Sequence, residues 1–357
     1  MHTKKALVLA VLAASTGAMA QSSVTIFGVV DVAATRISGS GAGNRLGLSS
    51  GGNAASRLGF RGTEDLGGGL SASFWLEGAL GIDTGTGTAG GPLLFQRRST
   101  VSLSNQFGEL RLGRDYLPTW WNIALLEPFG ARGVGTSQAH SNFGYNTIWS
   151  NNSVGYILPA TLGGVYGQVQ YAFGEKSSTA PNDKQGNTLS GRLGYQNGPL
   201  NVAAAYSEFK QVLGASDVAP VTIGRDLKVG NVAATWDFGV VKPYVFYGQE
   251  KVTGNPAGNN RLDSYMLGAT APLGGLGELR ATVARYDLKD SSSDFNKVAI
   301  GYGYLFSKRT QFYVTAARLT NKGAGTRSLA ADGMATLAPI RAGGNSTGLD
   351  VGIRHSF

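Results

Sequence analysis

Apolar and polar residues alternate along extended segments of this chain, most clearly in its last eleven residues, Thr347–Phe357. One face of an extended strand would carry Leu349, Val351, Ile353 and Phe357, and the other would carry Asp350, Gly352, Arg354 and Ser356. Alternation with a period of two predicts a strand that lies between an apolar and a polar environment. From these residues alone, an ordinary amphipathic edge strand and a strand that faces lipid both remain open.

The first twenty residues have the pattern of a secretory signal peptide. Lys4 and Lys5 form a positively charged n-region, residues 6–14 form a short apolar h-region, and Ala18-Met19-Ala20 fits a cleavage site. The apolar run is too short to cross a bilayer as a helix. We therefore expect a cleaved signal peptide over residues 1–20 and a single mature domain over residues 21–357.

The composition of the mature chain narrows the fold class. The chain has no cysteine, so an exported protein of this kind cannot depend on disulfides for its stability. Glycine is abundant, at 54 of 357 residues, and no apolar run after residue 20 is long enough for a membrane helix. Dispersed apolar residues with a period of two, repeated along a glycine-rich chain, are typical of a membrane β-barrel.

The charge of the chain is basic but dispersed. Lysine and arginine exceed aspartate and glutamate by 9, and by 7 once the two signal-peptide lysines are removed. A basic excess often indicates nucleic acid or an anionic membrane surface. Here the arginines stand singly along predicted strands, which favours the lining of a lumen over a phosphate-binding patch, so we expect no nucleic-acid partner. Scattered solvated charge is the alternative.

Short turns and long polar segments alternate along the chain. The short turns lie near residues 64–69, 105–108, 162–164, 197–199, 237–239, 273–277 and 306–309. The long segments lie near residues 38–53, 83–93, 117–150, 175–187, 209–226, 251–261, 288–294 and 320–346. Asn-Gly, Asp-x-Gly and Gly-Gly sequences in the short turns are hairpin signals.

These seven turns and eight loops make fifteen connections, which join sixteen strands. An even strand number, with short turns at one end and long loops at the other, predicts an all-β, antiparallel transmembrane barrel. Closure of the barrel leaves no edge and satisfies every backbone group inside the bilayer. The first strands are expected over about Ser22–Ile37, Ala54–Glu64 and Leu70–Ile82, with a loop over Ser38–Asn53.

Several segments, in order along the mature chain, resemble the general porins of β-proteobacterial outer membranes. They are Ser23–Asp31, Ser56–Leu70, Phe107–Tyr116, Asn152–Tyr156, Leu305–Thr310 and Val351–Phe357. The resemblance implies a homotrimer in the outer membrane of a Gram-negative bacterium, with periplasmic turns, extracellular loops and a third loop, residues 117–150, that folds inward. It also implies that Phe357 is part of the signal that the barrel-assembly machinery reads.

Charged residues are expected to line this channel. By strand phase, Arg57 and Arg61 point inward, opposite Leu58 and Phe60, and Asp31 and Glu77 are also on the lumen phase. The resemblance adds further residues to the constriction: Arg97 and Arg114 in the basic wall and Glu127 in the third loop. Arg98 is expected on the face opposite Arg97, Trp149 stands where the family often has an arginine, and Trp120 and Trp121 are expected to pack the loop against the wall.

We therefore expect a water-filled channel for passive diffusion of small hydrophilic solutes and ions, with a modest preference for anions. Its expected partners are outer-membrane lipid and lipopolysaccharide, the barrel-assembly machinery and two further copies of the chain. We expect no cofactor, and no acidic cluster indicates a calcium site. Charge at the narrowest point sets selectivity in such channels.

Three alternatives have different sequence signatures. A solute-specific channel for organic anions or sugars would use paired arginines or a row of aromatic residues, and the tryptophans of the third loop leave that interpretation open. An enzyme is disfavoured because the mature chain has only His140 and His355 and no G-x-S-x-G motif, metal-ligand cluster or glycosidase carboxylate pair. A soluble adhesin conflicts with the terminal Phe357 and the apolar strand faces.

Overall fold

Seventeen strands form one antiparallel sheet in the computed structural model, which describes residues 23–87, 91–213, 224–254, 260–332, 334 and 337–357. The strands are β1 (Ser23–Gly39), β2 (Gly43–Ser50), β3 (Arg57–Gly67), β4 (Leu70–Ala79), β5 (Arg98–Asn105), β6 (Gly108–Tyr116), β7 (Trp149–Ile157), β8 (Val165–Ala172), β9 (Thr188–Asn197), β10 (Leu200–Leu213), β11 (Arg225–Trp236), β12 (Lys242–Thr253), β13 (Arg261–Leu273), β14 (Gly277–Leu288), β15 (Phe295–Leu305), β16 (Thr310–Asn321) and β17 (Asn345–Ser356). The expected signal peptide lies outside the described residues.

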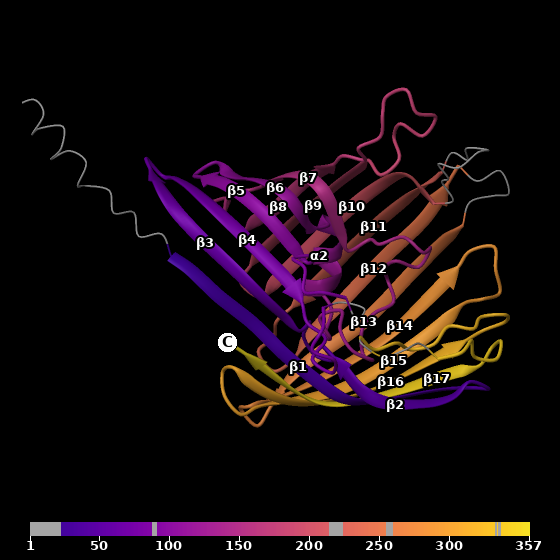
Figure 1. Ribbon diagram of the computed structural model, residues 1–357. Coiled ribbons are helices and arrows are strands. Elements are labelled where there is room, and N and C mark those ends of the chain that lie inside the picture. The colour runs from indigo at the N-terminus through magenta and orange to yellow at the C-terminus, as the bar shows by residue number, and fades with distance from the viewer. Residues whose placement is uncertain (1–22, 88–90, 214–223, 255–259, 333, 335–336) are drawn as a thin grey trace, which may run out of the picture.

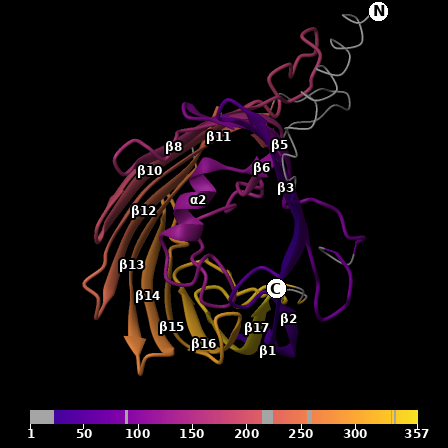
Figure 2. The same cartoon turned by 90° about the vertical axis from the view of Figure 1, so that its left-hand side faces the viewer.

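The sheet closes on itself through its first and last strands (Figures 1 and 2). β1 pairs with β17 in an antiparallel register that runs from Val29 opposite Ser356 to Gly39 opposite Ser346. The terminal Phe357 extends this pairing, because its backbone N–H and C=O both bond to Gly28, each at 3.1 Å. Closure removes the open edges at which a sheet would otherwise aggregate.

The second position of the barrel is built from two strands. β2 pairs with β1 over Val32–Gly39, and β3 pairs with the same side of β1 over Ser23–Val29. Since β2 and β3 share one position, seventeen strands fill sixteen positions around the barrel, which confirms the predicted architecture. The expected loop over Ser38–Asn53 is wrong over most of its length, because residues 43–50 continue the pairing of β1.

Apolar side chains cover the outside of the barrel, the reverse of a water-soluble protein. On β15, Val298 and Ile300 point outward and are 48% and 60% exposed, whereas Lys297 and Ala299 point inward and are buried. The same alternation recurs on β13, where Leu267 is exposed and Met266 is buried. An apolar exterior and a polar interior fit a barrel that faces lipid.

Among the residues that the structure describes, one short helix lies inside the barrel. α2 (Pro118–Leu125) begins with a proline, whose fixed φ suits the first position of a helix. Its contacts are with the inner wall of β8–β11, as Figure 2 shows from one end of the barrel. No helix among the described residues is long and apolar enough to cross a membrane.

Candidate functional site

The third loop runs across the barrel interior, as predicted, between the end of β6 at Tyr116 and the start of β7 at Trp149. Near its start, the Thr119 hydroxyl lies 2.8 Å from that of Ser207 on β10, and the Asn122 amide donates to Asn231 on β11 at 2.9 Å. These buried polar pairs fix α2 to one wall, because breaking them would leave unpaired polar groups out of water.

The middle of the loop is bound to the opposite part of the wall, around β14–β17. The Val134 N–H donates to the Asp350 carboxylate on β17 at 2.9 Å, and the Gln138 N–H donates to the Tyr286 hydroxyl on β14 at 2.7 Å. Further along, the Asn142 N–H donates to Glu250 on β12 at 3.0 Å. The loop is therefore attached to the wall at several separate strands, and it narrows the lumen beside it.

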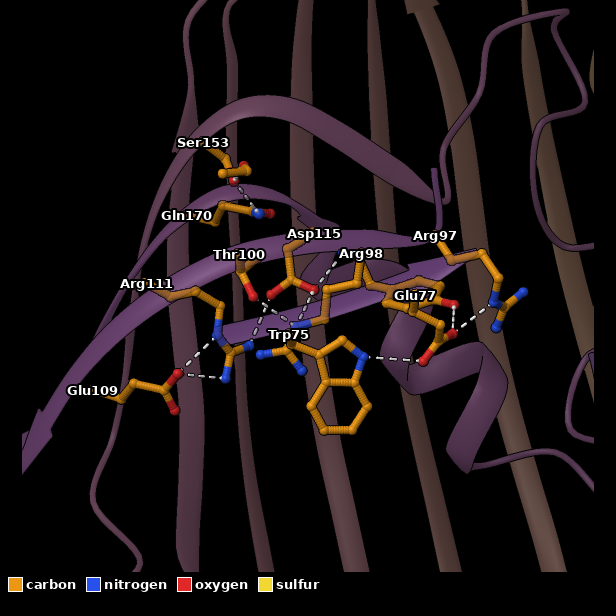
Figure 3. A network of polar contacts seen from close by, with 12 residues as sticks. Trp75, Glu77, Arg97, Arg98, Thr100, Glu109, Arg111, Asp115, Ser153 and Gln170 are labelled. Carbon is orange, nitrogen blue, oxygen red and sulfur yellow. Dashed lines mark hydrogen bonds and ion pairs between the residues drawn. The ribbon is translucent and has the colours of Figure 1, made fainter. Parts of the chain in front are cut away.

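Glu77 on β4 is the centre of a charged cluster on the wall that faces this loop (Figure 3). Arg97, just before β5, donates its Nε to Glu77 at 2.6 Å, and Trp75 donates its indole N–H to the same carboxylate at 3.1 Å. Arg57 on β3 approaches Glu77 to 3.9 Å and keeps more of its side chain exposed than Arg97 does. Adjacent strands thus bring two arginines and one carboxylate together.

The third loop and the last loop complete the cluster with residues that the sequence reasoning missed. Arg132, in the third loop, forms an ion pair with Asp332 at 3.2 Å, and its guanidinium lies 6.0 Å from the Trp120 ring centre. Burial lowers the pKa of Arg132, the carboxylate of Asp332 opposes that effect, and the charge of Arg97 adds to it. Arg132 therefore lies near the wall arginines, and the five charged residues form what we call the constriction ring: Arg57, Arg97, Arg132, Glu77 and Asp332.

A signal for Arg132 was present in the sequence. The third loop is predicted to fold inward, and Arg132 is a cation within it, so this loop can bring positive as well as negative charge to the wall. Asp332 carried no such signal, because the approach of residues 320–346 to the third loop depends on packing between segments that are about 200 residues apart. That approach is visible in the contact between Arg327 Nη1 and Asn142 Oδ1 at 2.6 Å.

Two predicted constriction arginines lie away from the ring. Arg61 is on the lumen face of β3, four residues nearer the short-turn end than Arg57, which is about 13 Å along a strand. Its guanidinium stacks on Phe27 and Trp75 at 5.3 and 5.2 Å. Arg114 continues the outward phase of Leu110 and Leu112 on β6, and it donates to Gln96 and Asn151 at the base of the third loop.

Two predicted constriction acids are buried in the protein rather than exposed to the lumen. Asp31 is fully buried and accepts bonds from the Asn53 and Ala54 N–H groups at 2.9 and 2.6 Å, which holds the irregular segment between β2 and β3. Glu127 is 5% exposed and accepts from the N–H groups of Ala131 and Ser137 inside the third loop. Both carboxylates accept from backbone N–H groups, whereas Glu77, which is as little exposed as Glu127, bonds Arg97 and is counted with the ring for that reason.

The expected placement of Arg98 on the opposite face is wrong. Arg98 lies directly across from Glu77 in the β4–β5 register and on the lumen face, with its Nε 3.1 Å from the Thr100 hydroxyl and 3.6 Å from Asp115. Arg97 also turns inward because it precedes the first residue of β5, where strand phase no longer holds. Arg111 bonds Asp115 at 2.8 Å and so continues this ion-pair network toward the short-turn end (Figure 3).

Trp120 and Trp121, the two tryptophans of the third loop, pack as expected, and Trp149 at the start of β7 lies beside them. Trp120 is 3% exposed, within the apolar cluster between the loop and the wall. The rings of Trp121 and Trp149 each lie against Tyr116, at 5.0 and 5.7 Å between centroids. Among the described residues, no group of three or more histidines, cysteines, aspartates or glutamates could hold a metal ion.

Because of the buried His140, the packing of the third loop against the wall is expected to depend on pH. Its ring meets Trp120 edge-on at 4.9 Å, and its Nδ1 is buried without a hydrogen-bond partner. Burial, with the charges of Arg132 and Lys297, lowers the pKa of His140 from 6.5 to about 4. The neutral ring is therefore favoured in the folded loop. Its contribution to the free energy of unfolding, about 3 kcal/mol, is complete above pH 6.5, the pKa of a free histidine, and is lost as the pH falls to about 4.

We expect single-channel current noise to rise between pH 6.5 and pH 4 because the protonated ring loosens the loop. A His140→Phe variant keeps a ring against Trp120 but cannot titrate, so its noise should rise less over the same range. His355→Asn, a change on an exposed histidine of β17, is the control and should behave like the unaltered protein. Equal noise in all three proteins at pH 4 would contradict the role of His140.

The fold and the site define a class. A closed antiparallel barrel with an apolar exterior, and with a loop that carries charge into its lumen, is a pore-forming protein of the outer membrane. The sequence model described as Gram-negative porin matches residues 6–324 of the chain. The chain belongs to this Gram-negative porin family and forms a channel in the outer membrane, and the family consists of channels rather than enzymes.

Individual relatives span nearly the whole chain. Outer membrane porin protein 32 of Delftia acidovorans is 42% identical over 99% of this chain and 100% of its own length. An outer membrane porin protein of Bordetella pertussis is 30% identical over the same shares. The solved structure of an anion-selective porin from Comamonas acidovorans matches with a TM-score of 0.85 at 40% identity, covering 94% of this chain and 100% of that chain.

Proposed function

We propose that this porin is a general diffusion channel with a modest preference for anions. The observation that carries the proposal is the composition of the constriction ring. Three arginines and two carboxylates give it a formal charge of +1 (3 − 2). Glu127 and Asp31 are not counted, because they bond backbone N–H groups and form no ion pair with the arginines of the ring. A small net charge in a low-dielectric constriction raises the local concentration of the opposite ion.

A sugar-specific channel is less well supported. A row of exposed aromatic residues along the lumen would be needed to guide sugars, whereas Trp120 is buried and Trp121 packs on Tyr116. The related protein from Comamonas acidovorans, described as anion-selective, supports the anion proposal for this chain.

The test is the reversal potential of the purified protein in a planar bilayer under a potassium chloride gradient. We expect a shift toward the chloride potential, and a larger shift in the same direction for Asp332→Asn, because this change raises the ring charge to +2. Ser291→Asn, in the exposed loop between β14 and β15, is a neutral control. A potassium-directed shift in the unaltered protein, or no effect of Asp332→Asn, would overturn the proposal.

We also propose that three copies of the chain assemble, as the porin resemblance implies. The loop between β4 and β5 supports a contact between copies, because it presents three consecutive apolar residues, Leu93, Leu94 and Phe95, to the outside. Phe95 packs edge-on against Phe60 on the outer wall at 6.2 Å. An exposed apolar patch held in place against the wall is typical of a protein interface.

Lipid headgroups, including lipopolysaccharide, are the proposed partners of the rest of the outer wall. Near the long-loop ends of β10–β15, outward-facing residues form ion pairs, such as Lys210 with Asp226 at 2.9 Å and Arg261 with Asp263 at 2.7 Å. Tyr247 and Tyr265 lie beside this band, with their ring centres 5.2 Å apart. Tyrosines next to charged groups suit a membrane–water interface.

Phe357, at the end of β17, is proposed as part of the signal that the barrel-assembly machinery reads.

A further inference from the structure

A polar cavity of about 540 Å³ lies on the lumen wall at the short-turn ends of β12–β17, on a part of the wall that does not include the constriction ring. Its lining includes the side chains of Lys242, Tyr244, Glu278, Arg280, Gln311 and Arg354. Arg354 is four residues beyond Asp350, the point at which β17 contacts the third loop, and this spacing is about 13 Å along a strand. The cavity is therefore on the periplasmic side of the constriction.

Arg354 is available to a ligand. Its Nε is buried and has no hydrogen-bond partner within the described parts of the chain. Asp31, its register partner on β1, cannot fully serve it, because that carboxylate already accepts from Asn53, Ala54 and the Tyr313 hydroxyl. That buried atom is out of reach of a ligand, but Arg354 lines the cavity and forms no ion pair within the described residues, so the charge of its guanidinium remains available to a bound anion.

The other two cations of the cavity, Arg280 and Lys242, differ in how many hydrogen bonds and ion pairs they already form. Arg280 bonds Glu278 at 2.6 Å and Asn53 at 2.7 Å, so it is largely satisfied. Lys242 lies 5.5 Å from the Tyr244 ring centre and forms no ion pair among the described residues. Asp237 also lines the cavity, and its carboxylate accepts from the Gly239 N–H at 2.8 Å. The lining therefore carries three cations against the carboxylates of Asp237 and Glu278, and neither Lys242 nor Arg354 forms an ion pair within the described residues.

The spacing of the strands indicates the kind of anion that would fit. Lys242 is on β12 and Arg354 is on β17, five strand positions away, and neighbouring strands are about 4.8 Å apart. Five positions place the two backbones about 24 Å apart along the wall, so the two side chains act on one anion through their combined field and not through a direct bridge. This attraction grows with the charge of the anion, so an anion with several charges is favoured over a monovalent one.

We propose that this cavity binds a small multivalent oxyanion, such as one with two phosphate groups, at the periplasmic mouth of the channel. The proposal rests on the function proposed above, since it gives a channel that favours anions a second, separate contact for them. Charge-assisted hydrogen bonds from arginine to such oxyanions are short and strong.

The test uses the asymmetry of the channel. Pyrophosphate is added to one side of a bilayer that contains channels inserted in a known orientation, and the concentration that halves the chloride current is measured for each side. In the unaltered protein, block from the short-turn side should need less pyrophosphate than block from the long-loop side. Lys242→Gln with Arg354→Gln should raise the short-turn-side concentration about tenfold and leave the other side unchanged.

Two further proteins make the result decisive. Lys242→Gln alone changes a partly exposed residue that forms no ion pair within the described residues, and it should give part of the loss while the barrel stays folded. Lys308→Gln removes an exposed cation from the β15–β16 turn, outside the cavity, and should change nothing. Equal block from both sides in the unaltered protein, or no effect of Lys242→Gln and of the double variant, would overturn the proposal. Reversal potentials in potassium chloride alone would separately test the constriction ring.

Discussion

Replacing both Arg57 and Arg97 with glutamine is expected to convert the channel from anion preference to cation preference. The double variant leaves Arg132 as the one cation of the constriction ring, against Glu77 and Asp332, so the formal charge of the ring changes from +1 to −1 (1 − 2). Because the ring lies where the third loop narrows the lumen, each charge acts there more strongly than on an open surface. The sign of the reversal potential under a potassium chloride gradient should change.

A matched variant separates charge from the loss of an ion pair. Arg97→Gln alone leaves Glu77, which is nearly buried, without its 2.6 Å partner. In Arg97→Gln with Glu77→Gln, both members of the pair become neutral, and Arg57 and Arg132 against Asp332 keep the ring at +1. This second protein should retain anion preference. An unchanged reversal potential in the Arg57→Gln, Arg97→Gln protein would defeat the assignment of these arginines to the selectivity of the channel.

The barrel could be predicted because its determinants are local and repeated. Alternating apolar residues such as Leu349, Val351 and Ile353 predict a strand wherever they occur, and short glycine-containing turns predict hairpins. β2 was missed because Gly43–Ser50 has the composition of a loop, with glycine, serine and asparagine among its residues. Its strand conformation depends on the unusual length of β1, which offers it a partner.

The constriction could be predicted only in part, because strand phase tells which face a residue occupies but not what covers that face. Asp31 has the lumen phase, yet the segment between β2 and β3 and the Tyr313 hydroxyl enclose it. Phase also fails at strand ends, where Arg97 turns inward beside Arg98. Arg132 and Asp332 meet only after two loops fold into the same space.

Glu127 stabilises the third loop from within and does not line the pore. Burial raises the pKa of Glu127, and the charge of Lys297 on β15 and the bonds from Ser137 and Ala131 oppose that rise. Lys297 is 3% exposed and donates to the Thr136 carbonyl of the same loop. The loop is therefore held against the wall by a buried cation and carboxylate as well as by backbone hydrogen bonds.

Replacing Lys297 with methionine is expected to release this part of the third loop. Methionine has a similar length but no charge, so the buried Glu127 would lose the nearby positive charge of Lys297. A buried charge left without compensation costs about 3–5 kcal/mol. The loop can avoid this cost by moving away from β15. We expect frequent conductance fluctuations in single-channel recordings and a lower temperature for the loss of the quiet open state.

Removing the carboxylate as well should reverse much of this effect. In Lys297→Met with Glu127→Gln, no uncompensated charge remains, and the glutamine carbonyl can still accept from the Ser137 N–H, which bonds Glu127 at 3.1 Å. Replacement of a buried ion pair by neutral groups is often close to neutral in stability, whereas removal of one partner is not. Quiet recordings from the double variant and noisy ones from Lys297→Met would therefore identify the buried charge, rather than lost packing, as the cause. Quiet recordings from Lys297→Met itself would show that the backbone bonds to Asp350 and Tyr286 hold the loop without it.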